Sequence, residues 1–188
     1  MSNFTLDVGL AAKLKVAFAR NGWTEELVDS ACEGDKLGQF REVLLGRSSI
    51  TVIENLIDCG AAPFVPNGWS VEEHQKGGQF KLAISQVQLF LAKGQQDGKS
   101  IEGNKLRKEL AGKKVLNANV LDYLLANPHL IPEEWKGKYV FFWGTIYRRS
   151  DGNLFVRCLY WLGDWWVWSY RWLGRDFGGL SPAALRAS

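Results

Sequence analysis

The sequence predicts an α+β protein: a small N-terminal helical module followed by a mixed body whose C-terminal antiparallel sheet, of three or more strands, packs on helices. Short helical patterns separated by glycines fill the N-terminal region, and further helical patterns occupy residues 104–135. Residues 139–173 instead alternate aromatic and β-branched side chains between two turn signals. We therefore assign residues 1–47 to the helical module and residues 48–188 to an α+β body with a Trp-rich antiparallel sheet at 139–173.

The N-terminal module is predicted to contain three short helices. Residues 6–20 place an apolar side chain at every fourth position, Thr24 caps a second helix that Gly34 ends, and Asp35 caps a third that ends at Gly46. A helix-turn-helix DNA reader would present many basic and amide side chains along its last helix. Because the third helix has few such side chains, a packing or docking module is the favoured interpretation; they are Lys36, Gln39 and Arg41.

Between the module and the sheet, helical and extended patterns alternate. In chain order we predict a strand or short helix at 50–57, a loop at 60–68, a strand that opens at 69, a strand at 86–91, helices that begin at 104 and after 117, and a helical turn at 132–135.

The C-terminal segment has the strongest pattern and contains six of the nine tryptophans. Two turn signals, at 150–153 and 162–164, divide it into antiparallel strands at 139–147, 154–161 and 165–173. Both faces of this sheet are largely apolar. Helices are expected to cover one face, and the aromatic side chains are all core if helices or another subunit also cover the second.

Strict alternation along these strands sorts their side chains onto two faces. On the first strand it places Phe142 and Ile146 together, opposite Trp143 and Thr145. On the third strand it gathers four large aromatic side chains on one face: Trp166, Trp168, Tyr170 and Trp172.

The net charge of +3 is unevenly distributed along the chain. Residues 139–188 contain six Arg and three Asp with no Lys or Glu, so residues 1–138 are neutral overall. Arginine stacks on aromatic rings and binds phosphate through bidentate hydrogen bonds, and nucleic-acid bases stack on aromatic side chains. We therefore hypothesise a non-enzymatic binding module for single-stranded nucleic acid, in which the four aromatic side chains stack bases and four arginines contact phosphate: Arg148, Arg149, Arg157 and Arg171.

Two other function classes stay open. The first is a protein-interaction or self-assembly component whose aromatic sheet face docks a partner, because Trp, Tyr and Arg are enriched at interface hot spots; a sugar ligand also suits such a face. The second is an enzyme with an unfamiliar site, since the chain has no P-loop, dinucleotide-binding, nucleophile-elbow or HExxH motif. No cofactor is expected.

Single residues of potential chemistry have simpler structural interpretations. His74 adjoins two glutamates, but no further His or Cys lies at ligand spacing, so we expect no metal site. His129 follows a proline and is interpreted as a turn residue. Glu133 and Glu134 suit the start of a helix better than a pair of opposed catalytic carboxylates.

The cysteine pattern and the hydropathy favour a cytoplasmic protein. The three cysteines form no CxxC pair and are expected to be reduced, buried thiols: Cys32, Cys59 and Cys158. No apolar run approaches the ~20 residues needed to span a bilayer, and the N-terminal residues lack the pattern of a signal peptide. We therefore expect no membrane partner.

Several segments resemble a family of short bacterial proteins without an assigned function. The resemblance rests on VLNANVLDYLLANPHLIPEEWKGK, YVFFWGTIYRRSDGNLFVRCLYW and the closing PAALRAS. It extends more loosely through PFVPNGWSVEEHQKGG to GWTEELVDSACEGD, so it covers most of the chain. The resemblance implies that the chain is one natural unit, and it implies no activity, ligand or catalytic residue.

Overall fold

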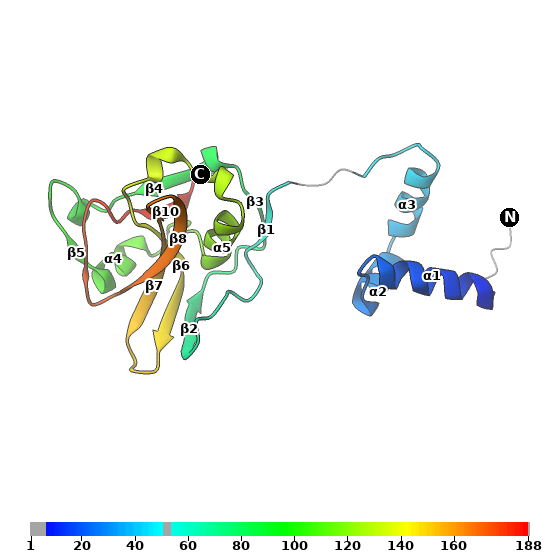
Figure 1. The fold of residues 1–188 in the computed structure, drawn as a ribbon, viewed down its shortest axis with the longest axis horizontal. Helices are drawn as coiled ribbons and strands as arrows, with labels where there is room; N and C mark the ends of the chain where they lie inside the picture. The colour runs from blue at the N-terminus through cyan, green and yellow to red at the C-terminus, as the bar shows by residue number, and fades with distance from the viewer. Residues whose placement is uncertain (1–6, 51–53, 188) are drawn as a thin grey trace. The chain divides into compact units, whose positions relative to one another are not determined.

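The computed structural model describes residues 7–50 and 54–187 of the 188-residue chain (Figure 1). The chain forms two compact units, Met1–Val52 and Ile53–Ser188. The first is helical and the second combines helices with sheets, which confirms the predicted α+β class. None of the described helices is long and apolar enough to cross a membrane.

The N-terminal unit consists of α1 (Val8–Arg20), α2 (Glu25–Cys32) and α3 (Lys36–Leu44). Thr24 caps α2 as predicted, because its hydroxyl accepts a hydrogen bond from the Leu27 amide. Asp35 precedes α3, but its side chain makes no capping hydrogen bond, so that predicted cap is wrong. No side chain of the three helices is fully buried within the described residues.

The second unit contains two α-helices, ten strands and four short 3-10 turns among its described residues. The helices are α4 (Gly103–Leu110) and α5 (Ala118–Ala126). The strands are β1 (Leu56–Asp58), β2 (Trp69–His74), β3 (Gln79–Lys81), β4 (Val87–Phe90), β5 (Ile101–Glu102), β6 (Val140–Arg149), β7 (Leu154–Leu162), β8 (Trp165–Trp172), β9 (Asp176–Phe177) and β10 (Ala183–Arg186). The 3-10 turns are η1 (Ile84–Gln86), η2 (Lys93–Gln95), η3 (Pro128–Leu130) and η4 (Glu133–Trp135).

The predicted elements of this unit are largely present. The three C-terminal strands appear as β6, β7 and β8, and the helices predicted from 104 and after 117 appear as α4 and α5. The helical turn predicted at 132–135 is the 3-10 turn η4. Within the segment predicted as a strand or short helix at 50–57, residues 51–53 lie outside the described residues and β1 begins only at Leu56.

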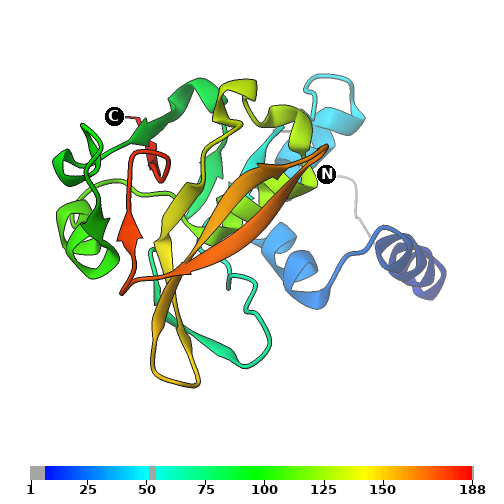
Figure 2. The same cartoon turned by 60° about the vertical axis from the view of Figure 1, so that its left-hand side comes forward.

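The main sheet has six strands, in the order β4-β10-β6-β7-β8, with β2 also paired to β6. The β6–β7–β8 meander is antiparallel, as predicted, while β10 runs parallel to β6. Figure 2 shows the long, twisted β7–β8 hairpin at one side of this sheet. Two smaller sheets pair β1 with β3 and β5 with β9.

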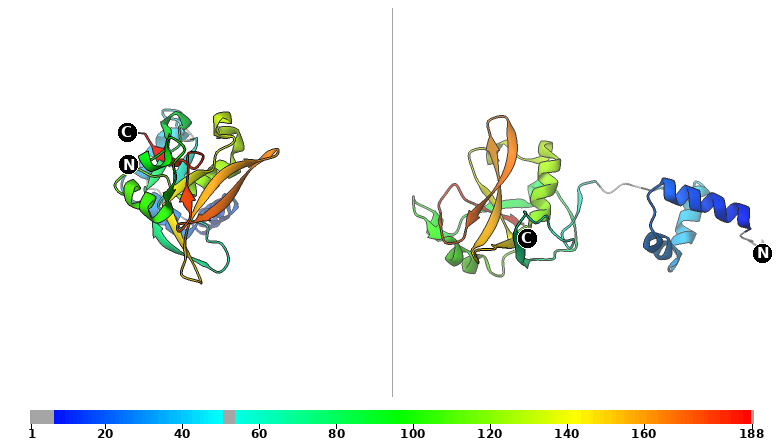
Figure 3. Two further views of the ribbon diagram at one scale, coloured as in Figure 1. Left: turned by 90° about the vertical axis from the view of Figure 1, so that its left-hand side faces the viewer. Right: turned by 60° about the horizontal axis from the view of Figure 1, so that its bottom comes forward.

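Helices cover both faces of the central strands. On one face, Leu121 and Leu124 of α5 pack with Phe142 and Leu159, which we call the α5-side core. On the other face, Leu106 and Leu110 of α4 pack among residues from β6, β7 and β9, which we call the α4-side core: Phe141, Trp143, Val156 and Phe177. The two views of Figure 3 show the same arrangement from other directions. The sheet is therefore a buried layer at its centre, in agreement with the alternative in which both faces are covered.

A bulge at Gly144 overturns the alternation predicted for β6. Phe141 pairs with Cys158 and Ile146 with Val156, so β6 advances five residues while β7 advances two. As a result, Ile146 lies in the α4-side core, whereas Phe142 lies in the α5-side core. Those two residues were predicted to share a face, and that prediction is wrong.

Gly144 is the point where the N-terminus of α5 meets β6. Its amide donates to the Leu116 carbonyl, and its carbonyl accepts from the Gln75 amide. A Cβ atom at this position would lie 2.9 Å from both Cα and Cβ of Asn117. The helix can therefore reach the strand only because residue 144 has no side chain.

Replacing Gly144 with Ala should destabilise the second unit by about 1–3 kcal/mol, because the added methyl group overpacks the contact with Asn117. Urea unfolding followed by tryptophan fluorescence measures this change. Gly178→Ala is the control, since a Cβ there meets only the Lys99 carbonyl oxygen at 3.8 Å. Equal stability of the two variants would show that α5 can shift away from β6 without cost.

Candidate functional site

The four aromatic residues predicted to stack bases lie along β8 and share a face, but it is the face that α5 covers. Trp166 is buried in the α5-side core and Trp168 packs against it. Tyr170 and Trp172 are more open, with 46% and 40% of their surfaces exposed. The exposure of these side chains therefore increases along β8 from the buried Trp166 to Tyr170 and Trp172, and the four do not form one exposed surface.

Arg157, predicted to contact phosphate, is buried and neutralised within the protein. Its guanidinium donates to both carboxylate oxygens of Asp122 on α5, at 2.7 and 3.1 Å. The rings of Phe64 and Trp168 lie 5.2 and 4.4 Å from the guanidinium carbon. Burial opposes the charge, but the bonds to Asp122 outweigh it and raise the pKa of Arg157. With 1% of its surface exposed, Arg157 is not available to phosphate, and that role is wrong.

The other three predicted arginines are also engaged. Arg148 donates two hydrogen bonds to Glu72, which lower the pKa of that carboxyl. Arg149 pairs with Asp151. Arg171 lies on the α4 side of the sheet, away from the β8 aromatic face, where it donates to the Asp176 carbonyl and the Ser181 hydroxyl. The eight residues predicted to form one binding surface therefore lie on different faces of the sheet and do not form a single surface.

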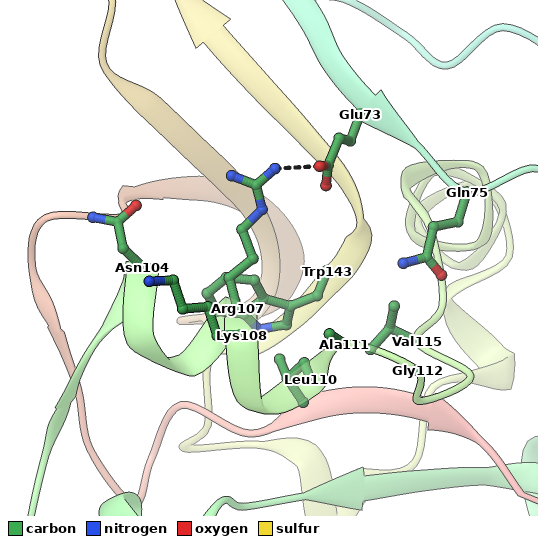
Figure 4. Close-up of a pocket in the computed structure, with 10 residues that line it drawn as sticks. All are labelled: Glu73, Gln75, Asn104, Arg107, Lys108, Leu110, Ala111, Gly112, Val115 and Trp143. Atoms are coloured by element: carbon green, nitrogen blue, oxygen red, sulfur yellow. Dashed lines mark ion pairs between the residues drawn. The ribbon is translucent and has the colours of Figure 1, made fainter.

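A different surface gathers basic side chains, most of which lack an acidic partner in the described residues. A hollow of about 470 Å³ lies between α4, the end of β2 and Trp143 of β6 (Figure 4). A second, of about 220 Å³, shares Gln75 and Val115 with it and continues past the loop before α5. Together their walls carry five basic side chains and one acidic side chain, Glu73. We call the two adjoining hollows the basic groove; its basic residues are Lys76, Arg107, Lys108, Lys114 and Arg186.

Only one of these five cations is neutralised within the described residues. Arg107 forms an ion pair with Glu73, which Figure 4 marks with a dashed line. The other four form no ion pair in residues 7–50 and 54–187. Arg186 is held against the Phe80 ring, 4.8 Å from its centroid. Because these four side chains are exposed and share one concave surface, their fields add there.

The walls of the basic groove also contain buried polar atoms without a hydrogen-bond partner. They are the indole Nε1 of Trp143 and the Oδ1 of Asn117. The other side-chain atom of Asn117, Nδ2, donates to the carbonyls of Cys59 and Gln75 and so fixes the wall between the hollows. A buried polar group without a partner is costly, so a ligand that supplied hydrogen bonds to these two atoms would gain binding energy.

The excess of arginine after residue 139 does not reveal the basic groove, because four of its five basic residues precede that position. The segment 104–114, NKLRKELAGKK, carries five basic residues and one acidic residue and could have been noticed from the sequence. Lys76 and Arg186 could not, since they come from segments far from α4 in the chain.

The histidines and cysteines do not gather into a metal site among the described residues. Nδ1 of His74 lies 2.9 Å from the Thr145 hydroxyl, and His129 sits in the turn η3, as interpreted from the sequence. Across the described residues, no three of His, Cys, Asp and Glu come close enough to hold a metal ion. Cys59 and Cys158 are buried, whereas Cys32 is exposed, which corrects the expectation for that thiol.

Asp122→Ala should destabilise the protein by about 3 kcal/mol, because it leaves the buried Arg157 charge without a partner. This value is at the lower end for a buried pair, since 34% of the Asp122 side chain is exposed. Asp151→Ala removes the partner of the exposed Arg149 and should cost less than about 1 kcal/mol. Chemical unfolding of both variants provides the comparison, and equal losses would contradict burial as the cause.

One thiol out of three should react quickly with Ellman's reagent at pH 8 in the folded protein. Burial raises the pKa of the Cys158 thiol to about 12. Burial also raises the pKa of Cys59, with a contribution from Asp58. Both thiols therefore stay protonated and unreactive until the protein unfolds, while exposed Cys32 reacts. Cys32→Ser should abolish the fast phase; a fast phase that persists would show that a buried thiol is accessible.

Comparison with known proteins assigns no family to the chain. No family model, no curated protein and no solved structure matches it. The resemblance to a family of short bacterial proteins therefore stays a prediction, and the function is inferred from the geometry of the site.

Proposed function

We propose that the chain is a non-enzymatic binding module that holds the phosphate backbone of single-stranded nucleic acid in the basic groove. The observation that carries this proposal is the balance of charge on two adjoining hollows, five basic side chains against one acidic side chain. A positively charged groove that follows the backbone is the common feature of proteins that bind single strands without sequence preference.

The physical basis is electrostatic. Lysines and arginines that neutralise phosphates release condensed counterions, which supplies most of the free energy of non-specific binding. The cations that lack acidic partners in the described residues can make such contacts without first breaking an ion pair. Gln75 lines the larger hollow and offers a side-chain amide N–H that can donate to phosphate or sugar oxygens.

The charge distribution supports the basic groove over the sheet arginines as the phosphate site. Each of Arg148, Arg149 and Arg157 already faces a carboxylate, so binding phosphate there would require breaking an ion pair. Lys76, Lys108 and Lys114 are exposed and have no such partner in the described part of the chain. We therefore place the phosphate site of the proposed nucleic-acid binder in the basic groove, beside α4 and the ends of β2 and β10, and not on β8.

Binding rather than catalysis is the function that suits this groove. The one thiol among the lining residues is that of Cys59, and burial raises its pKa, which opposes thiolate formation. Both histidines lie outside the residues that line the two hollows, so the walls offer no imidazole for general acid–base chemistry.

The affinity for a fluorescently labelled single-stranded oligonucleotide should fall steeply with salt. With four or five phosphate contacts, the slope of log K against log salt should be about −3, because each contact on a single strand contributes about −0.7. Lys108→Ala and Lys114→Ala should each weaken binding about fivefold at 0.1 M salt and make that slope shallower by about 0.7. Fluorescence anisotropy titrations over a range of salt concentrations measure both quantities.

Arg149→Ala is the matched control, since it removes one exposed positive charge from the sheet and not from the groove. It should leave affinity and salt slope nearly unchanged. If Arg149→Ala weakens binding as much as Lys114→Ala, the sheet and not the groove contacts phosphate. Absence of salt-dependent binding to both RNA and DNA oligonucleotides would overturn the proposed function.

A further inference from the structure

The strand β8 forms an open edge of the main sheet. It pairs with β7 over its whole length, from Trp165 opposite Leu162 to Trp172 opposite Phe155, without a bulge. No strand pairs with its other side in the described residues. Natural sheets protect such edges with lysine, proline, bulges or short strands. The eight residues of β8 contain none of these, and Arg171 is their one charged residue.

The register identifies which backbone groups face outward. Leu173 donates its amide to the Leu154 carbonyl. In an antiparallel pair every second residue bonds to the same neighbour, so the backbone groups of Trp165, Val167, Ser169 and Arg171 also point toward β7. The amides and carbonyls of Trp166, Trp168 and Tyr170 consequently point away from β7. They have no hydrogen-bond partner in residues 54–187, so β8 offers a ladder ready for one further strand.

We infer that two copies of the chain pair through β8, antiparallel about a two-fold axis at Trp168. In this register Trp168 faces Trp168 of the second copy, and Trp166 faces Tyr170. These are the residues whose backbone groups point outward, so each pair exchanges two hydrogen bonds. The same patch serves both copies, as a closed two-fold dimer requires.

Complementarity between a cation and an aromatic ring favours a second copy as the occupant of this edge. The two-fold axis places Trp165 opposite Arg171 of the second copy. Nη1 of that guanidinium is held by the Asp176 carbonyl and the Ser181 hydroxyl, and the rest of the group can lie over the indole face. Asp164, in the turn before β8, lies opposite Trp172, so no two like charges face each other across the pairing. Trp165 has 63% of its surface exposed in the single chain, and the pairing would cover it.

This inference is independent of nucleic-acid binding, because it rests on a different edge of the sheet. Pairing through β8 is a specific form of the self-assembly predicted from the sequence, with a defined strand and register. The aromatic side chains of β8 would then contribute through cross-strand pairs between copies.

Sedimentation of the full chain tests the inference. We expect a dimer at micromolar concentration. Trp165→Lys places a second positive charge opposite Arg171 and should raise the dimer dissociation constant at least about tenfold. Trp165→Glu places a carboxylate there and should change that constant by less than about threefold, because an ion pair replaces the cation–aromatic contact.

Leu180→Lys is the control for added charge, since Leu180 is equally exposed, at 64%, and lies outside β8. It should leave the dimer intact. A chain that sediments as a monomer at about 100 μM, far above the range of micromolar affinities, would overturn the inference. A dimer that Trp165→Lys and Trp165→Glu weaken equally would overturn the register, as would one that neither variant changes.

Discussion

The architecture of the second unit depends on the close contact between Asn117 and Gly144. This contact brings the N-terminus of α5 onto β6, where the Ala118 amide donates to the Thr145 hydroxyl and the Leu116 carbonyl accepts from Gly144. The bulge it creates divides β6 into one half beside β10 and another half beside β2. Asn117 also holds the carbonyls of Cys59 and Gln75, so the same junction shapes the wall between the two hollows of the basic groove.

The cations around this junction are of two kinds, some paired with a carboxylate and others without an acidic partner in the described residues. Arg157 shows the first case: a buried cation is tolerated because Asp122 and two aromatic rings replace the water it loses. Lys76 and Lys114 show the second, since exposed ammonium groups keep their water and need no partner to be stable. The free cations are therefore the ones that an anionic ligand can engage at little cost in protein stability.

The sequence predicts the strands of the meander well because alternation and turn residues are local signals. It cannot predict the bulge in β6, since that depends on a helix terminus arriving from residue 117. It likewise cannot show that Arg157 meets Asp122, which lies 35 residues earlier in the chain and on another element. Half of the groove is visible as the basic segment 104–114, but Lys76 and Arg186 reach it only through the pairing of β2 and β10 with β6.

The two proposed surfaces can act together because the sheet separates them. The groove is built at the ends of β2 and β10, whereas β8 lies two strands beyond β6 on the other side. Pairing through β8 would therefore leave both grooves of a dimer open. Two grooves on one particle raise the effective concentration of the second site once a strand occupies the first. Weak phosphate contacts in each groove, which are all that a few lysines provide, would then suffice to retain a long single strand while a short one dissociates.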